Sequence, residues 1–111
     1  MTTIFGKIIR RELPAEIVFE NGWLIAIQDI HPVAPVHLLL IPKKEIRDFQ
    51  SLTPIDYPLL GEVVAAAQQL AVQFEVEEGY RLLTNCGIEA GQTIFHLHFH
   101  LIGGRKLGPM A

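Results

Sequence analysis

The sequence predicts an α+β fold: a five-stranded antiparallel sheet with one long helix and one short helix. Apolar residues recur every three or four positions between Leu59 and Phe74, which is typical of a helix with one buried face. Five shorter apolar segments are bounded by Asn, Gly or Pro, which is typical of strands. The order α-β-β-β-α-β-β with mostly short connections favours antiparallel pairing, with the long helix across one face of the sheet.

The chain begins with a short helix and a hairpin. Residues 4–11 place their apolar side chains on one helical stripe. Residues 17–20 and 23–29 are strand-like, and Asn21-Gly22 joins them. Asn-Gly is a preferred pair for a type I′ turn, because both central residues of that turn have positive φ. We therefore predict a tight hairpin here.

A third strand and the long helix follow. Residues 36–41 are almost continuously apolar and end at Pro42. Thr53-Pro54 suits a helix start, since threonine is a good N-cap and proline fits the first turn. Pro58 follows closely, so we expect the regular helix to begin near it.

The last two strands are expected at residues 80–85 and 93–102, with a glycine-containing loop at residues 86–92 between them. Neither an internal repeat nor a linker interrupts the sequence. We therefore expect residues 1–111 to form one domain.

Composition and charge narrow the function classes. Half of the residues are hydrophobic and 19% are charged, which is typical of a globular protein. The formal net charge of −3 gives no electrostatic argument for binding nucleic acid or a membrane surface. The single cysteine, Cys86, excludes an intramolecular disulfide. Without a signal-like or membrane-spanning apolar run, we expect a cytoplasmic protein.

Three of the five histidines alternate with apolar residues near the C-terminus, in the segment His96-Leu97-His98-Phe99-His100-Leu101-Ile102. In a strand, residues two apart share a face and are separated by roughly 6.6 Å. The pattern therefore predicts three imidazoles on one face of the sheet and three apolar side chains on the other.

Three uses of such a histidine face are open on spacing alone. The rings could be solvated or hydrogen-bonded without a further role. They could bind zinc, with His37 as an added ligand. One neutral ring could attack a phosphorus or carbonyl centre, and the middle histidine, His98, is the natural nucleophile. The loop Gly91-Gln92-Thr93 favours the third use, since its amides and hydroxyl could bind anionic oxygens.

The histidine segment resembles the H-φ-H-φ-H-φ-φ signature of the histidine triad superfamily, in which φ is apolar. The resemblance to the Hint branch extends over nearly the whole chain. It includes, in order, residues 3–9, 29–32, 34–37, 41–44, 79–81 and 91–93. The resemblance implies a homodimer with a ten-stranded sheet. It also implies hydrolysis of the P–N bond of purine nucleoside phosphoramidates, and of aminoacyl-adenylate-like compounds, without a cofactor.

The resemblance also implies roles for the histidines. His98 matches the residue that attacks the α-phosphorus and carries the nucleotidyl group. His100 matches a phosphate contact, and the carbonyl group of His96 matches the one that orients the nucleophile. His37 matches a histidine that pairs with the nucleophile.

The same resemblance places the nucleotide. Asp29 matches the carboxylate that accepts the ribose hydroxyls. The remaining matches are the apolar positions around the base and the polar positions at the phosphate, which are Ile27, Ile30, Leu39, Asn85, Gln92 and Thr93. The family more often has serine where Thr93 stands.

Two features depart from the family pattern. The tail at residues 105–111 lacks the tryptophan that commonly helps build the partner subunit's leaving-group pocket. The N-terminal cysteine pair of zinc-containing relatives is missing too, so we expect no metal. Two alternative functions stay open: hydrolysis of dinucleoside polyphosphates, as in the Fhit branch, and nucleotide binding or scaffolding with residual catalysis. The Fhit branch usually has glutamine where His100 stands, which argues against the former.

Overall fold

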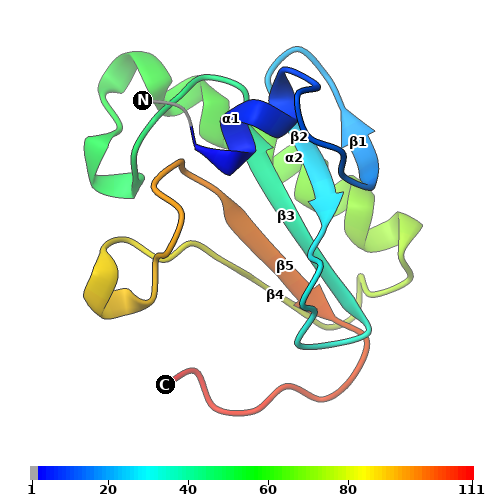
Figure 1. Ribbon diagram of the computed structural model, residues 1–111. Helices are drawn as coiled ribbons and strands as arrows, with labels where there is room; N and C mark the ends of the chain where they lie inside the picture. Colours follow the sequence, from blue (N-terminus) through cyan, green and yellow to red (C-terminus); the bar gives the residue numbers. More distant parts are fainter. Residues whose placement is uncertain (1–2) are drawn as a thin grey trace.

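The computed structural model describes residues 3–111 and confirms the α+β class (Figure 1). The helices are α1 (Ile4–Ile9) and α2 (Tyr57–Gln73), and the strands are β1 (Ile17–Glu20), β2 (Leu24–Gln28), β3 (Val36–Pro42), β4 (Tyr80–Leu83) and β5 (Phe99–Gly103). Short 3₁₀ turns lie at Phe49–Ser51, Pro54–Asp56 and Ile88–Ala90. No helix in the described part of the chain is long and apolar enough to cross a membrane.

The five strands form one antiparallel sheet in the order β1-β2-β3-β5-β4. The last strand, β5, therefore lies between β3 and β4 and is not an edge strand. Its neighbour β3 pairs Leu39 with His100 and His37 with Ile102. This register brings the histidines of two distant segments to one region of the sheet.

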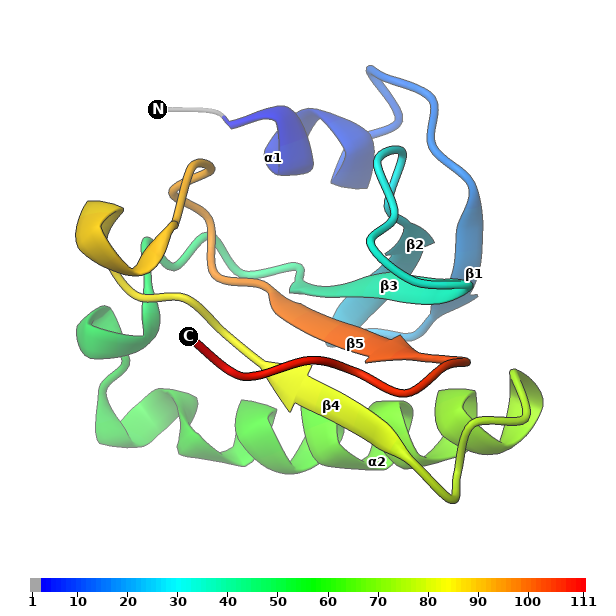
Figure 2. The ribbon, with the colours of Figure 1, turned by 90° about the horizontal axis from the view of Figure 1, so that it is seen from below.

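The two helices cover opposite faces of the sheet, as Figure 2 shows. Between α2 and the sheet lies the larger core, to which Leu97, Phe99 and Leu101 contribute. The prediction that these three residues share a face is therefore confirmed. The smaller core on the α1 side consists of Phe5, Ile8, Ile25, Ile27, Leu39 and Ile41. The candidate site lies on the α1 side.

Both helices begin where the sequence predicts. The Thr3 hydroxyl accepts a hydrogen bond from the Gly6 amide at 3.2 Å and caps α1. Thr53 caps the 3₁₀ turn at Pro54–Asp56, and α2 starts only at Tyr57. Pro58 then lies in the first turn of α2. Backbone N–H groups in a first turn have no partner within the helix, so a proline is tolerated there.

The Asn21-Gly22 connection is a hairpin, but the type I′ prediction is wrong. Gly22 is not among the described residues with positive φ. Instead, the Asn21 side chain accepts hydrogen bonds from the amides of Trp23 and Leu24, at 2.8 and 3.0 Å. This side-chain turn replaces the positive-φ turn that the dipeptide favours.

The predicted last strand is also too long, since β5 begins at Phe99 rather than at residue 93. Pro42 ends the neighbouring strand β3, and proline has no N–H with which to continue the ladder. His96 and His98 consequently lie on an irregular segment that leads into β5. The backbone of this segment forms hydrogen bonds outside the sheet. For example, the Leu97 amide donates to the Ile46 carbonyl at 2.7 Å.

Candidate active site

His98 lies under α1, with its ring 4.9 Å from the Phe5 ring in an edge-on arrangement. Only 9% of the residue is exposed. Its Nδ1 donates a hydrogen bond to the His96 carbonyl oxygen at 2.7 Å. A carbonyl only accepts, so the proton of the neutral ring is on Nδ1. Nε2 therefore carries an unshared electron pair, which is the state that a nucleophile requires.

His96 is buried, and both of its ring nitrogens have partners. Nε2 donates to the Pro42 carbonyl at 2.8 Å, and the Thr3 hydroxyl lies 3.4 Å from Nδ1. The ring thus anchors the irregular segment to the end of β3 and to α1. What His96 offers to the reactive ring is its backbone carbonyl group.

A residue that sequence reasoning missed fixes the backbone of His98. The Thr84 hydroxyl donates to the His98 carbonyl oxygen at 2.6 Å. Thr84 follows the end of β4 and precedes the half-buried Asn85. This contact brings the next residue, Asn85, close to the segment that carries His98. No sequence motif marks Thr84, so its role could not be predicted from the sequence.

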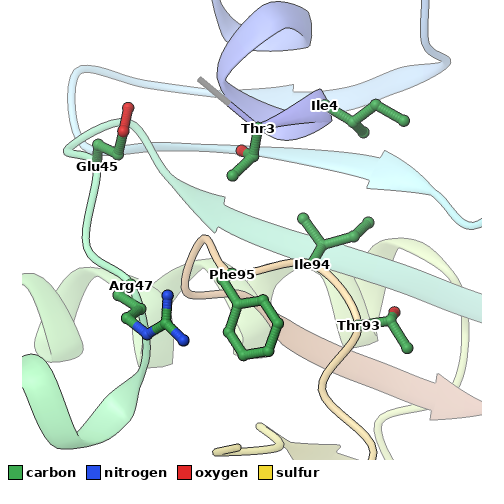
Figure 3. Close-up of a pocket in the computed structure, with 7 residues that line it drawn as sticks. All are labelled: Thr3, Ile4, Glu45, Arg47, Thr93, Ile94 and Phe95. Carbon is green, nitrogen blue, oxygen red and sulfur yellow. The ribbon is translucent and has the colours of Figure 1, made fainter. Parts of the chain in front are cut away.

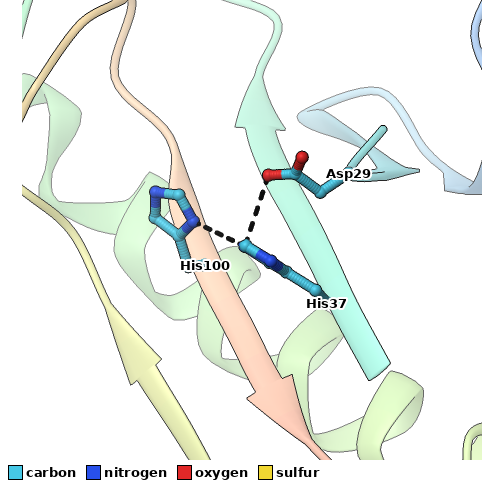
Figure 4. A group of neighbouring side chains, drawn as sticks. All are labelled: Asp29, His37 and His100. Atoms are coloured by element: carbon cyan, nitrogen blue, oxygen red, sulfur yellow. Dashed lines mark hydrogen bonds and ion pairs between the residues drawn. The ribbon is translucent and has the colours of Figure 1, made fainter. Parts of the chain in front are cut away.

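A second cluster joins Asp29, His37 and His100 (Figure 4). His37 Nε2 lies 2.9 Å from His100 Nδ1 and 3.3 Å from Asp29 Oδ2. The Val33 amide donates to His37 Nδ1 at 3.1 Å. Because Nδ1 accepts this bond, the proton of the neutral His37 ring is on Nε2 and points at His100.

This chain of bonds also fixes the tautomer of His100. His100 Nδ1 accepts a hydrogen bond from the N–H at His37 Nε2, so the neutral His100 ring carries its own proton on Nε2. The two triad rings thus have opposite character: His98 Nε2 has a free electron pair, and His100 Nε2 has an N–H to donate. Their centroids are 5.2 Å apart.

The expected pairing of His37 with His98 is wrong in this structure, since His37 bonds to His100. The possible ligand atoms of Asp29, His37 and His100 all lie within 4.8 Å of one another, which is close enough for a metal ion. A metal would need the electron pair of His37 Nε2, however, and the Val33 amide places a proton there. The geometry fits a hydrogen-bond relay better than a metal site.

Burial keeps the site histidines neutral. It lowers the pKa of His98, against the opposing effect of the hydrogen bond to the His96 carbonyl. It also lowers the pKa of His100 to about 4, helped by the neighbouring His98 and His37 rings. The pKa of His37 is lowered by burial as well, against the opposing effect of Asp29. All three rings are therefore uncharged at neutral pH.

These lowered pKa values predict a pH-dependent stability. Above about pH 6.5 the rings are neutral in both the folded and the unfolded state, so they add no pH dependence. Below it, the unfolded chain binds protons that the folded site excludes. We expect the free energy of unfolding to fall from about pH 6.5 towards about pH 4, as measured by urea denaturation. His100→Asn should show a shallower fall, and identical profiles for the two proteins would contradict this explanation.

An apolar row leads across the sheet to His100. Ile27 pairs with Leu39, and Leu39 pairs with His100, so all three side chains point to the α1 face. Both aliphatic residues are buried with Phe5. The third predicted base contact, Ile30, is 85% exposed and lies outside this core.

Gln92 does not offer its side chain or its amide to a ligand. Its buried side chain accepts from the Gly87 amide at 2.8 Å and donates to the carbonyls of Arg47 and Ile94 at 3.0 and 3.1 Å. Its backbone amide bonds to the Gly87 carbonyl. The prediction of a binding role for Gln92 is therefore wrong, because packing uses every one of these groups. Thr93, in contrast, is exposed.

Comparisons with known proteins agree with this geometry. The HIT domain family matches residues 10–107. An uncharacterized HIT-like protein of Synechocystis is 50% identical over 103 residues, which are 93% of this chain and 90% of that protein. A HIT family hydrolase from Clostridium thermocellum has a TM-score of 0.93 and 48% identity, covering 97% of this chain and 95% of that one. A histidine triad nucleotide-binding protein from Candida albicans has a TM-score of 0.84 and 30% identity, covering 99% and 84%.

Proposed function

The chain belongs to the HIT domain family, and from this membership and the site geometry we propose that it is a purine nucleoside phosphoramidate hydrolase. The observation that carries the proposal is the 2.7 Å bond from His98 Nδ1 to the His96 carbonyl, which leaves Nε2 as a nucleophile. A relative of similar structure is described as a hydrolase, and another as nucleotide-binding. Both descriptions agree with the proposed activity.

The reaction has two displacements at phosphorus. First, the electron pair of His98 Nε2 forms an N–P bond, and the substrate P–N bond breaks. Its electrons go to the departing amine, which takes one proton from solvent. Second, a water oxygen forms a bond to the same phosphorus and loses a proton to solvent. The N–P bond breaks, its electron pair returns to His98 Nε2, and a nucleoside monophosphate is released. The His100 Nε2–H donates to a phosphoryl oxygen and stabilises the charge that develops there.

The other site residues hold the nucleotide. Asp29 Oδ1 accepts from the His31 amide at 2.8 Å, and Oδ2 faces His37. A carboxylate has about four acceptor positions, so two are left for the ribose hydroxyls. Ile27 and Leu39 form an apolar floor for the base, and Asn85 and Thr93 contribute polar groups at the phosphate. The homodimer with a ten-stranded sheet stays a prediction of the sequence.

The covalent intermediate provides the test. Protein mixed with adenosine 5′-phosphoramidate and quenched in alkali, where phosphohistidine is stable, is expected to carry one adenylyl group on the peptide that contains His98. His31→Asn, which changes an exposed loop histidine, serves as the matched control and should be labelled equally. Labelling of another residue, or turnover without an adduct at any time point, would contradict the mechanism. Parallel assays with a diadenosine polyphosphate separate this function from that of the Fhit branch.

A further inference from the structure

The loop between β2 and β3, residues 29–35, carries two groups of the candidate site. One is the Asp29 carboxylate, and the other is the Val33 amide, which donates to His37 Nδ1 at 3.1 Å. Residues 30–33 are all exposed, so packing in a core does not hold the Val33 amide in place. A contact from outside the loop is needed to fix its direction.

The start of the C-terminal tail, residues 104–111, supplies that contact. Val36 pairs with Gly103, so the chain leaves β5 beside the point where the loop enters β3 (Figure 1). Arg105 Nη2 donates to the Val33 carbonyl at 2.8 Å. Its Nη1 donates to the Lys106 carbonyl, also at 2.8 Å. The second bond holds the guanidinium against the tail and directs its free side at the loop.

The residue before Arg105 packs on the same loop. Gly104 has a φ of +95°, a conformation that side chains with a Cβ rarely adopt. A Cβ at this position would lie 3.0 Å from Pro35 Cβ and 3.4 Å from Val36 N. The turn after β5 therefore requires glycine, and this glycine allows the backbone to approach closely enough for Arg105 to reach Val33.

A continuous series of hydrogen bonds leads from Arg105 to the ring that faces the phosphate. Arg105 holds the Val33 carbonyl, the Val33 amide donates to His37 Nδ1, and His37 Nε2 donates to His100 Nδ1. The carbonyl and the amide belong to one residue. A guanidinium bound to the carbonyl therefore opposes the backbone rotations that would turn the amide away from His37.

The contacts assigned to the nucleotide do not depend on Arg105. Asp29 Oδ1 accepts from the His31 amide, and the Asp29 amide donates to the His37 carbonyl at 3.0 Å. The pocket of about 620 Å³ in Figure 3 lies beside the segment before β5, and the tail contributes none of its described lining residues. An effect of Arg105 is therefore expected in the chemical step rather than in nucleotide binding.

We propose that Arg105 is a positioning residue for the reaction. Its bond to the Val33 carbonyl keeps the Val33 amide on His37 and so determines which nitrogen of His100 carries the proton. The inference rests on the proposed function, in which the His100 Nε2–H donates to a phosphoryl oxygen. Arg105 does not touch the substrate and acts through Val33, His37 and His100 in turn.

The direct test is the tautomer of His37 in the unliganded protein at neutral pH, measured by ¹⁵N chemical shifts. The wild type should show a proton on Nε2 alone. In Arg105→Ala, a measurable fraction should carry it on Nδ1, and kcat for adenosine 5′-phosphoramidate should fall about threefold to tenfold. The affinity for adenosine monophosphate should be unchanged. Arg105→Lys retains a donor and should recover part of both the tautomer and kcat.

Lys106→Ala is the matched control. It removes the neighbouring positive charge and leaves the backbone carbonyl that accepts from Arg105, so its tautomer and kcat should equal those of the wild type. A wild-type His37 tautomer in Arg105→Ala would overturn the inference, whatever happens to kcat. A wild type without phosphoramidate hydrolysis would refute the proposed function instead, and the ¹⁵N shifts of Arg105→Ala would then decide by themselves whether Arg105 orders the histidines.

Discussion

Replacement of His98 by asparagine is expected to lower kcat for adenosine 5′-phosphoramidate by about 10⁴-fold or more, because the residue that forms the covalent bond is lost. Asparagine is the informative substitution, since its side-chain amide nitrogen occupies the place of Nδ1. It can still donate to the His96 carbonyl, which accepts from His98 at 2.7 Å. The variant thus retains the orienting bond and lacks the nucleophilic Nε2.

Two further measurements test whether the loss of activity comes from the chemical step and not from unfolding or weaker nucleotide binding. The thermal unfolding midpoint should change little, and the affinity for adenosine monophosphate should stay within a few-fold of the wild type, as measured by calorimetry. His98→Ala, which also leaves space beside the Phe5 ring, should be equally inactive but less stable. Retention of wild-type turnover by His98→Asn in a folded protein would show that His98 is not the nucleophile.

Residue spacing was sufficient to predict the fold class and the importance of the histidine segment. The stripe from Leu59 to Phe74 has a period that only a helix satisfies, and alternation around His98 leaves Leu97, Phe99 and Leu101 for the core. These predictions depend on local periodicity. They hold because the same residues that form each element also bury its apolar face.

The predictions that failed depend on register and packing, which spacing does not contain. His37 is opposite Ile102, one step along the face from His100 and two steps from His98, so it reaches only the nearer ring. Gln92 is polar and lies in a glycine-containing loop, yet its amide is fully used in tying Arg47 to Ile94. Which residue faces which partner is decided by the pairing of β3 with β5.

Backbone hydrogen-bond donors are a second kind of functional group that cannot be recognised in the sequence. The Val33 amide sets the tautomer of His37, but any residue except proline supplies such a group. The backbone of Val33 is in turn held by Arg105, whose side chain donates to the Val33 carbonyl at 2.8 Å. The Val33 side chain is more than half exposed, so the sequence shows no signal for its role.

Replacement of Val33 by proline is therefore expected to lower kcat/KM about tenfold to a hundredfold, although Val33 lies outside the triad. Loss of the amide frees His37 Nδ1 to take the proton. His37 Nε2 then accepts from His100 Nδ1, and His100 turns an electron pair instead of an N–H towards the phosphate. Val33→Ala keeps the amide and should retain wild-type activity.

The pH profile distinguishes this effect from a general disturbance of the loop. Burial lowers the pKa of both His37 and His100, and the neighbouring His98 ring lowers that of His100 further. With the Val33 amide in place, an extra proton on either ring also breaks one bond of the relay, which opposes protonation as well. Without the amide, the pKa of His37 rises towards its ordinary value, helped by Asp29. The acid limb of kcat/KM should therefore move to higher pH in Val33→Pro, and ¹⁵N chemical shifts should show a proton on His37 Nδ1. Equal profiles and equal histidine shifts for Val33→Pro and Val33→Ala would show that the amide does not control the relay.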